Sequence, residues 1–230
     1  MANVVIAGAS RGIGLALVEA YVEAGDHVFA LCRDPAASGR LSDLAGSNPG
    51  AITLGQVDFA DGGSIDRAGE AIGDTPVDLL INVAGIIRME SGPEDRNFDN
   101  WRESFEVMVV GPFHMTQALL PNLERAKGKV LTISSQVGAS TWGIGGFYSY
   151  GAAKAAINRA MKSLAVDLEP RGIAVAVVHP GYVLTDMGGP DAEITPQESA
   201  SGIRDVASRL TVKDTGSFWK WNGLIRAVFC

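Results

Sequence analysis

The chain has 230 residues, which is enough for one well-buried domain and short for two. Its hydrophobic content of 47% with 20% charged residues indicates a folded globular protein and argues against a disordered one. The net charge of -7 argues against a nucleic acid partner, and no apolar run is long enough to span a bilayer.

The amino-terminal segment and the cysteines predict a cytoplasmic protein. The chain enters a strand-like apolar run directly and lacks the basic segment of a secretory signal. Cys32 and Cys230 suggest neither a metal cluster nor a disulfide framework, which fits a reducing compartment. The three histidines are far apart in the sequence, so we expect no metal site.

Six short apolar runs, taken in chain order, predict the strands of a sheet. They lie at residues 3–8, 27–32, 51–57, 77–85, 129–134 and 173–181, and each is apolar throughout, as in strands buried on both faces. Amphipathic segments between them predict helices over residues 13–25, 64–73, 98–126 and 148–169, the last ending at Pro170 and Gly172. This alternation predicts an α/β fold: a doubly wound parallel sheet of about seven strands with helices on both faces.

The chain shows no sign of a division into smaller units. No low-complexity linker and no internal repeat interrupts the pattern, so we predict a single Rossmann-type domain over residues 1–230. After Gly181 the sequence becomes rich in glycine, proline and polar residues. This change predicts a substrate loop and a short helix around residues 182–210, outside the carboxyl ends of the strands.

A glycine-rich turn, "GASRGIG" at residues 8–14, follows the first strand and opens the first helix. Gly8, Gly12 and Gly14 let backbone N–H groups approach a pyrophosphate, which the positive end of the helix dipole also favours. Tight strand–helix turns use glycine anyway, and the first two glycines are spaced more widely than in G-x-G-x-x-G. The strand–turn–helix context nevertheless predicts a nucleotide site.

The end of the second strand bears on the choice between NAD and NADP. An acid at this position would grip the ribose 2′-hydroxyl of NAD, whereas the sequence has Cys32 followed by Arg33. Arg33 can pair with a 2′-phosphate, and Arg11 in the glycine turn adds a second positive charge. The alternatives are that both arginines are solvated surface residues, or that Asp34 faces the ribose. We expect NADP(H) to be preferred over NAD(H).

Tyr150 and Lys154 are one helical turn apart, so their polar ends share one face of the last predicted helix. The alternative is a pair that only decorates the helix start. An ammonium group near a phenol stabilises the phenolate and lowers the pKa of the phenol from about 10. Tyr150 would then be a usable acid or base. Tyr148 has no lysine in register, and we expect it to be a packing or pocket residue.

Five motifs occur in a characteristic order: "GASRGIG", "NVAG" at 82–85, "ISS" at 133–135, Tyr150-x-x-x-Lys154 and "HPGYVLTDM" at 179–187. With them the chain resembles the short-chain dehydrogenase/reductase family over essentially its whole length. The stretches "YSYGAAKAAIN", "TDMGGPDAEITPQES" and "FWKWNG" resemble the branch of small carbonyl reductases related to the sniffer and C-factor proteins.

The resemblance implies the catalytic residues. Tyr150 would exchange a proton with the substrate oxygen, and Lys154 would also hydrogen-bond the nicotinamide ribose. Ser135 would polarise the substrate oxygen, as one donor of an oxyanion hole does. Ser134 is the alternative, but the family pattern places the catalytic serine three residues before Gly138.

The resemblance also implies the cofactor contacts. Asp58 would contact the adenine amino group, although it is nearly as well explained as a cap of the following turn. Asn82 would help to line the adenosine side and brace the central strand, and Val183 and Thr185 would fix the carboxamide and pyrophosphate. The full expected set is Gly8, Ser10, Arg11, Gly12, Ile13, Gly14, Arg33, Asp58, Phe59, Asn82, Ala84, Gly85, Tyr150, Lys154, Pro180, Gly181, Val183, Thr185 and Met187.

One position departs from the family pattern. Where relatives have an asparagine that completes a catalytic tetrad, "FEVMVVGP" at residues 105–112 has Met108, which cannot hydrogen-bond as an amide does. In the family, the main-chain carbonyl at this position holds a relay water. Because Pro112 has no N–H, the Met108 carbonyl loses its helical partner whatever its side chain is. We therefore expect an active enzyme with a reduced rate.

The sequence thus predicts an NADP(H)-dependent carbonyl reductase or alcohol dehydrogenase. A nucleotide-sensing protein of the same fold is the alternative, with Met108 as its supporting feature. The resemblance implies a homodimer or homotetramer, built on the helices that begin near residues 98 and 148. We expect an apolar carbonyl or alcohol substrate, without membrane or nucleic acid, in a pocket formed by Ile87, Trp142, Phe147 and Tyr182.

Overall fold

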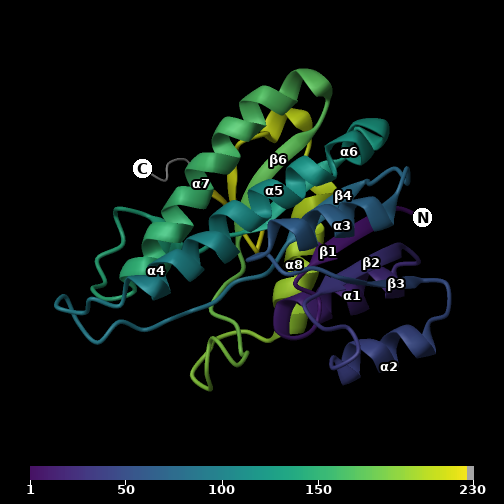
Figure 1. The fold of residues 1–230 in the computed structure, drawn as a ribbon. Helices are drawn as coiled ribbons and strands as arrows, with labels where there is room; N and C mark the ends of the chain where they lie inside the picture. The colour runs from purple at the N-terminus through teal and green to yellow at the C-terminus, as the bar shows by residue number, and fades with distance from the viewer. Residues whose placement is uncertain (227–230) are drawn as a thin grey trace.

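The computed structural model describes residues 1–226, and within them eight strands form one sheet (Figure 1). Their order across the sheet is β3-β2-β1-β4-β5-β6-β7-β8. The first seven pair in parallel and β8 runs antiparallel to β7. The strands are β1 Asn3–Ala7, β2 His27–Cys32, β3 Ile52–Gln56, β4 Leu79–Asn82, β5 Lys129–Ile133, β6 Ala174–His179, β7 Phe218–Lys220 and β8 Ile225–Arg226. The predicted parallel sheet of about seven strands is confirmed.

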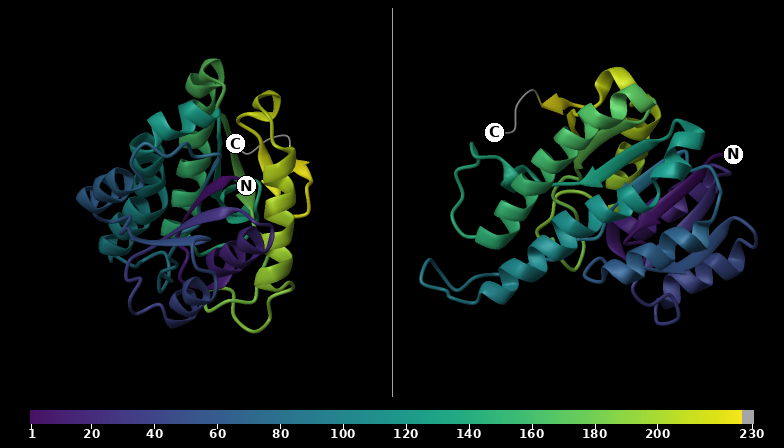
Figure 2. Two further views of the ribbon diagram at one scale, coloured as in Figure 1. Left: turned by 90° about the vertical axis from the view of Figure 1, so that its right-hand side faces the viewer. Right: turned by 45° about the horizontal axis from the view of Figure 1, so that its top comes forward.

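Helices cover both faces of this sheet (Figure 2). One face carries α1 (Gly12–Glu23) and α8 (Pro196–Arg209), with Leu41 of α2 (Gly39–Ser47) buried in the same core. The other face carries α3 (Gly62–Ile72), α5 (Gly111–Ala118) and α7 (Tyr148–Leu168) around a second core. Neighbouring strand residues point to opposite faces, so Val4 and Ile6 join the first core and Val5 and Ala7 the second. The doubly wound architecture is therefore also confirmed.

The third predicted strand differs from its expected environment. β3 is an edge strand, and none of its five residues is fully buried. The prediction that it is buried on both faces is wrong. An edge strand pairs on one side only and is less completely covered, and its apolar composition does not reveal that position.

The helix predicted over residues 98–126 is broken into four pieces. α4 (Phe98–Phe105) passes into a π-helical turn at Glu106–Val110, which is followed by α5 and α6 (Leu120–Ala126). α5 and α6 each have a proline in their first turn, and a proline has no N–H for the preceding helical turn. The predicted disruption near Pro112 therefore takes the form of a π-helical turn.

The predicted substrate segment divides into two parts. Residues 182–194 form a loop after β6, closed by a bridge between Val183 and Ile194. The helix that follows is α8, which packs against α1 and buries Ile203 and Val206 in the first core. Only the loop is therefore left at the carboxyl edge of the sheet. Within residues 1–226, no helix is long and apolar enough to cross a membrane, and Cys230 lies outside the described residues.

Candidate functional site

The glycine turn is fixed by close backbone contacts. Gly8 has a φ of 106°, and a Cβ atom there would lie 2.6 Å from the Ala84 nitrogen. A Cβ atom on Gly14 would lie 2.0 Å from the Gly8 carbonyl oxygen. Any larger residue would push the turn away from both neighbours. The turn after β1 and the "NVAG" segment after β4 therefore lie directly against each other.

The amino-terminus of α1 has the features of an anion site. Its first backbone N–H groups follow Arg11, whose side chain does not cap the helix, and its first turn contains no acidic residue. By contrast, Asp61 caps α3 by accepting the Gly63 N–H at 2.9 Å. Uncapped N–H groups and the positive end of the helix dipole together favour a phosphate group. The residues present, with Ser10 and Ile13 half-buried in the same turn, therefore fit the predicted pyrophosphate.

The two arginines predicted to read a 2′-phosphate differ in their surroundings. Arg33 is exposed just after β2, and among the described residues its side chain has no hydrogen-bond or ion-pair partner. Arg11 pairs with Asp186 at 3.0 Å, and both side chains are more than 70% exposed. Asp34, the alternative ribose ligand, accepts the Ala37 N–H at 2.9 Å within its own turn. Arg33 is thus the freer of the two cations, and the exposed Arg11 pair is held only weakly.

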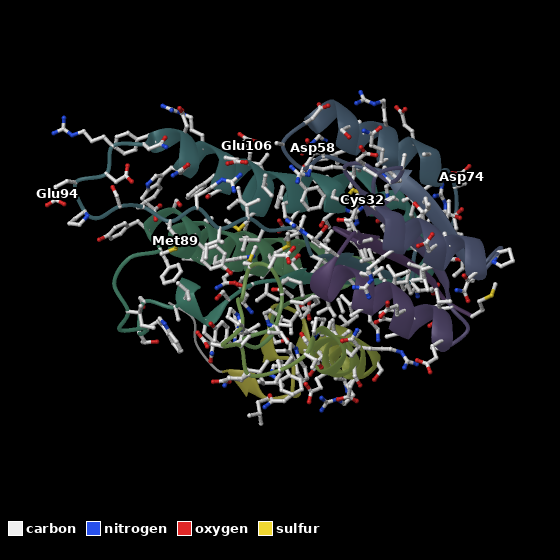
Figure 3. The ribbon with its side chains drawn as sticks, turned by 90° about the horizontal axis from the view of Figure 1, so that it is seen from below. Cys32, Asp58, Asp74, Met89, Glu94 and Glu106 are labelled. Atoms are coloured by element: carbon white, nitrogen blue, oxygen red, sulfur yellow. The ribbon has the colours of Figure 1, made fainter. Side chains whose placement is uncertain are left out.

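Asp58 and Phe59 follow the edge strand. Figure 3 shows Asp58 near Cys32, consistent with the Val57 N–H donating to the Cys32 carbonyl at 2.9 Å. The Asp58 carboxylate accepts the Ala60 N–H at 3.0 Å, which is the turn-capping role considered from the sequence. Phe59 is 4% exposed in the second core, so its backbone alone remains available to a ligand.

Asn82 lies at the carboxyl end of β4 and is 1% exposed. Its amide nitrogen is within 3.5 Å of the Pro112 carbonyl and of the Thr116 and Thr132 hydroxyls. The side chain therefore joins the central strand to α5 and β5, as the bracing role requires.

The three predicted catalytic residues meet where β5 and α7 approach each other. The side chain of Ser135 forms a hydrogen bond with Tyr150. One turn along α7, the Lys154 ammonium nitrogen donates to the Ile133 carbonyl at 2.8 Å and lies 5.7 Å from the centroid of the Tyr150 ring. The first turns of α7 and the end of β5 thus hold the Tyr150 phenol, the Ser135 hydroxyl and the Lys154 ammonium close together.

The direction of the Tyr150 pKa differs from the prediction. Burial raises the pKa of the phenol above its usual value of 10.0, and the hydrogen bond with Ser135 opposes this only in part. Burial also lowers the pKa of Lys154 to about 8. The expected acidification of Tyr150 by Lys154 is therefore absent, because desolvation dominates both groups.

The two alternatives weighed for this site occupy different environments. Ser134 is 1% exposed and its hydroxyl donates to Asn158 at 2.5 Å, so its role in this structure is to join β5 to α7. Tyr148 begins α7 and is 38% exposed, whereas Tyr150 is half-buried and hydrogen-bonds Ser135. The two serines therefore have different hydrogen-bond partners, the two tyrosines differ in exposure, and Ser135 and Tyr150 are the pair that interact.

Met108 lies inside the π-helical turn and is 1% exposed. A Cβ atom on Gly85 would be 3.8 Å from the Met108 sulfur and 3.9 Å from the Lys154 ammonium nitrogen. Met108 and Lys154 therefore approach Gly85 together. The Gly111 N–H donates to the Glu106 carbonyl, which is the longer hydrogen-bond spacing of a π-helix.

The segment after β6 contacts the glycine turn. A Cβ atom on Gly12 would lie 3.1 Å from the Thr185 methyl group, while the Thr185 hydroxyl accepts the Gly188 N–H at 3.1 Å. Pro180 is buried, and its carbonyl accepts the Ser199 hydroxyl of α8. The predicted cofactor residues from β1, β4 and β6 are thus brought to one edge of the sheet.

Apolar side chains gather on the three loops that follow β4, β5 and β6 at this edge. Ile87 and Phe147 are half-buried, and Trp142, Tyr182 and Met187 are exposed. The sequence did not single out two further exposed residues of these loops, Met89 and Leu184. Their only signal was their place after a strand end. A cavity of about 250 Å³ lies elsewhere, between β3 and α3.

Two charged residues of the loop after β4 have defined partners. Arg88 forms a bidentate ion pair with Glu103 of α4, with both nitrogen–oxygen distances at 2.9 Å. Glu90, which the sequence did not single out, accepts the Ser149 N–H at 2.9 Å. Within residues 1–226, no cluster of three or more potential metal ligands is present.

Comparison with known proteins adds independent information. The model of the short chain dehydrogenase family matches residues 2–194, which include every predicted site residue. The C-signal protein of Myxococcus xanthus is 36% identical over 150 residues, covering 64% of this chain and 90% of that protein. The carbonyl reductase Sniffer of D. melanogaster has a TM-score of 0.92 at 30% identity, over 99% of this chain and 100% of that one. The NADPH-bound carbonyl reductase from chicken fatty liver has a TM-score of 0.90 at 31% identity, over 98% of each chain.

Proposed function

The chain belongs to the short-chain dehydrogenase family of oxidoreductases, and we propose that it transfers a hydride between NADP(H) and a ketone, an aldehyde or a secondary alcohol. The observation that carries this proposal is the hydrogen bond between the buried Ser135 and the half-buried Tyr150, with Lys154 one helical turn away. It lies at the sheet edge where the glycine turn also ends. This is the edge at which open α/β sheets bind their ligands.

Three features support NADP(H) as the cofactor. The uncapped start of α1 suits the pyrophosphate, and Arg33 is free to pair with a 2′-phosphate. Asp34, which would favour NAD, is engaged in its own turn. Among the similar structures, the chicken carbonyl reductase is NADPH-bound. We therefore propose that NADP(H) is preferred over NAD(H).

The protein's own groups would handle the proton and the substrate oxygen, while NADP(H) supplies or accepts the hydride. In the reducing direction, Tyr150 donates its phenolic proton to the carbonyl oxygen, and Ser135 hydrogen-bonds the same oxygen. Lys154 stabilises the phenolate that remains. Because burial lowers the pKa of Lys154 to about 8, this residue can exchange protons close to neutral pH.

The substrate would be an apolar carbonyl compound or alcohol. The loops after β4, β5 and β6 present exposed apolar residues, among them Trp142, Tyr182 and Met187. Arg88, a cation that could grip a substrate carboxylate, is paired with Glu103. We propose that Ile87, Trp142, Phe147 and Tyr182 contact the substrate, and that the loop at residues 182–194 covers it. The cofactor and the substrate would then both bind within one domain.

A homodimer or homotetramer would pair the long helices of two copies. α7 carries the exposed residue Val166, and Val110 is exposed in the turn between α4 and α5. Exposed apolar residues on neighbouring helices suit a symmetric contact. Light scattering at micromolar concentration checks this, and a monomer would contradict it.

The proposed function is tested by following NADPH oxidation with a panel of aliphatic and aromatic ketones and aldehydes. Turnover with NADPH that exceeds turnover with NADH is the expected result. Quenching of cofactor fluorescence without turnover on any member of the panel would instead support the nucleotide-sensing alternative. Absence of both signals would contradict each of these functions.

A further inference from the structure

The residue that precedes the catalytic helix α7 has an unfavourable backbone conformation. Its N-cap residue, Phe147, has a left-handed backbone with φ of 53° and ψ of 34°, and Gly146 before it has a φ of 73°. A residue with a Cβ atom rarely adopts this conformation, and it persists only where other contacts hold it. The side chain of Phe147 provides no capping hydrogen bond. The first N–H groups of α7 therefore need a partner from elsewhere in the chain.

That partner is Glu90, which lies 59 residues earlier on the loop after β4. Its Oε1 atom accepts the Ser149 N–H at 2.9 Å. A carboxylate at this end of a helix satisfies free donors and is stabilised by the helix dipole. Burial raises the pKa of Glu90, but hydrogen bonds with Ser149 and with the Tyr148 backbone outweigh it and lower the pKa below its usual value of 4.5. The carboxylate is thus held in its charged, accepting form.

The loop that carries Glu90 is held both to α4 and to the start of α7. Two residues before Glu90, Arg88 forms a bidentate ion pair with Glu103 of α4. α4 in turn reaches α7, where the Ser104 and Ser149 hydroxyls lie 3.5 Å apart. Figure 3 shows Met89 on the part of this loop near α7, and Glu94 at its outer end. Glu90 is therefore placed at the helix by the fold, on a loop that also carries the apolar residue Ile87.

We propose that Glu90 is a positioning residue that caps α7 and thereby holds the Tyr150 phenol against Ser135. This inference rests on the function proposed above. Tyr150 directly follows the capped residue Ser149, so movement of the first turn displaces its ring. Lys154 lies one turn further on and is anchored independently to the Ile133 carbonyl. Loss of the cap should therefore disturb proton transfer more than cofactor binding, because reaction rates are sensitive to small misplacements of the reacting groups.

Two variants of Glu90 and one control test this proposal. Glu90→Ala removes the acceptor, whereas Glu90→Gln keeps an oxygen at the same distance from the backbone. The control is Glu94→Ala, which removes an exposed carboxylate from the same loop, where Glu94 has no hydrogen bond with the described part of α7. Each protein is measured by amide hydrogen exchange over residues 148–151 and by steady-state ketone reduction with NADPH.

We expect Glu90→Ala to speed amide exchange at the start of α7 by about tenfold or more, since the capped donor becomes free to open. We expect its kcat to fall by about tenfold with the KM for NADPH nearly unchanged. Glu90→Gln should recover most of both properties, and Glu94→Ala should match the wild type. A general loss of structure would change the exchange of all helices and the KM together.

The outcomes separate this inference from the proposed function. Unchanged exchange in Glu90→Ala would overturn the capping role, whether or not the protein is active. Faster exchange with an unchanged kcat would overturn the positioning role alone. If Glu90→Ala does not fold, Glu90→Gln still decides, because a loss as large as that expected for removal of the acceptor would contradict the hydrogen-bond argument. A wild-type protein that binds NADPH and reduces no carbonyl would overturn the function, while exchange would still report on the cap.

Discussion

The ammonium nitrogen of Lys154 lies 5.7 Å from the centroid of the Tyr150 ring, and both side chains are carried by α7. Burial raises the pKa of the phenol and lowers the pKa of the ammonium to about 8. Burial therefore disfavours the charged form of each group relative to water, although an ammonium with a pKa of about 8 remains mostly protonated at pH 7.

Tyr150→Phe should lower turnover by roughly a hundredfold or more, because it removes the proton donor and keeps the ring. Cofactor binding should be retained, since Lys154 and the glycine turn are untouched. The matched control is Tyr148→Phe, which alters an exposed phenol two residues earlier and should change turnover far less. Steady-state rates and cofactor fluorescence check both variants. Equal damage from the two changes would mean that the catalytic phenol is assigned wrongly.

Ser135→Ala should mainly lower kcat, whereas Ser134→Ala should mainly lower the free energy of unfolding. Ser135→Ala removes the hydrogen bond with Tyr150 and should lower kcat by roughly tenfold to a hundredfold while leaving the fold intact. Ser134→Ala breaks the buried bond with Asn158 and should lower the free energy of unfolding by about 1–3 kcal/mol, with a smaller effect on kcat. Urea denaturation and steady-state kinetics on both variants distinguish the roles. The reverse pattern would exchange the assignments of the two serines.

Arg33→Ala should weaken NADPH binding by about 1.5–3 kcal/mol and spare NADH, since only NADPH has the 2′-phosphate. Arg40→Ala is a suitable control, because Arg40 is also exposed nearby but pairs with Glu19. Titration of each variant with both cofactors measures the effect. Equal losses for NADPH and NADH in Arg33→Ala would remove Arg33 from the 2′-phosphate site.

Met108→Asn tests whether the side chain at this position matters for the proton relay. Met108 is 1% exposed, so an amide placed there should lower the free energy of unfolding by about 1–3 kcal/mol unless it finds partners. The π-helical turn changes the sequence-based expectation of a reduced rate: because it distorts the backbone whatever the side chain is, we expect kcat to change by less than about threefold. Measured turnover that rises well beyond this range would show that the asparagine side chain is needed for full activity.

Lys154 should leave a signature in the dependence of stability on pH. Its folded pKa of about 8 is below the unfolded value of 10.5, so between these values the unfolded chain binds a proton that the folded protein does not. The free energy of unfolding should therefore gain on the order of 3 kcal/mol as pH rises through this window, and below pH 8 the full cost of burying the charge remains.

Lys154→Met lacks this titration and should lose its stability advantage over the wild type as pH rises. Urea denaturation of both proteins at about pH 7 and about pH 10 measures the difference. The control is Lys162→Met, which alters an exposed lysine on the same helix. A wild-type minus Lys154→Met difference that stays constant with pH would contradict the burial of a charged Lys154.

Features that depend on local pattern could be predicted from the order of the amino acids. Apolar runs predicted six strands, and the strand–turn–helix context of Gly8 to Gly14 predicted the nucleotide turn. Both predictions were possible because the backbone conformation of a short segment depends largely on its own residues and their immediate neighbours. The spacing of Tyr150 and Lys154 placed both on one helical face for the same reason. The sequence pattern did not locate β7, β8 or α2, since short segments give little periodic signal.

Properties that depend on residues far apart in the chain became visible in the folded protein. The partial exposure of β3 follows from its place at the sheet edge, and the raised pKa of Tyr150 follows from burial against β5. The structural role of Ser134, which the family pattern had already set aside in favour of Ser135, follows from its hydrogen bond with Asn158. Glu90 reaches α7 across 59 residues of chain. Burial, dielectric environment and hydrogen-bond partners are set by packing, and no local sequence pattern specifies which residues that packing brings together.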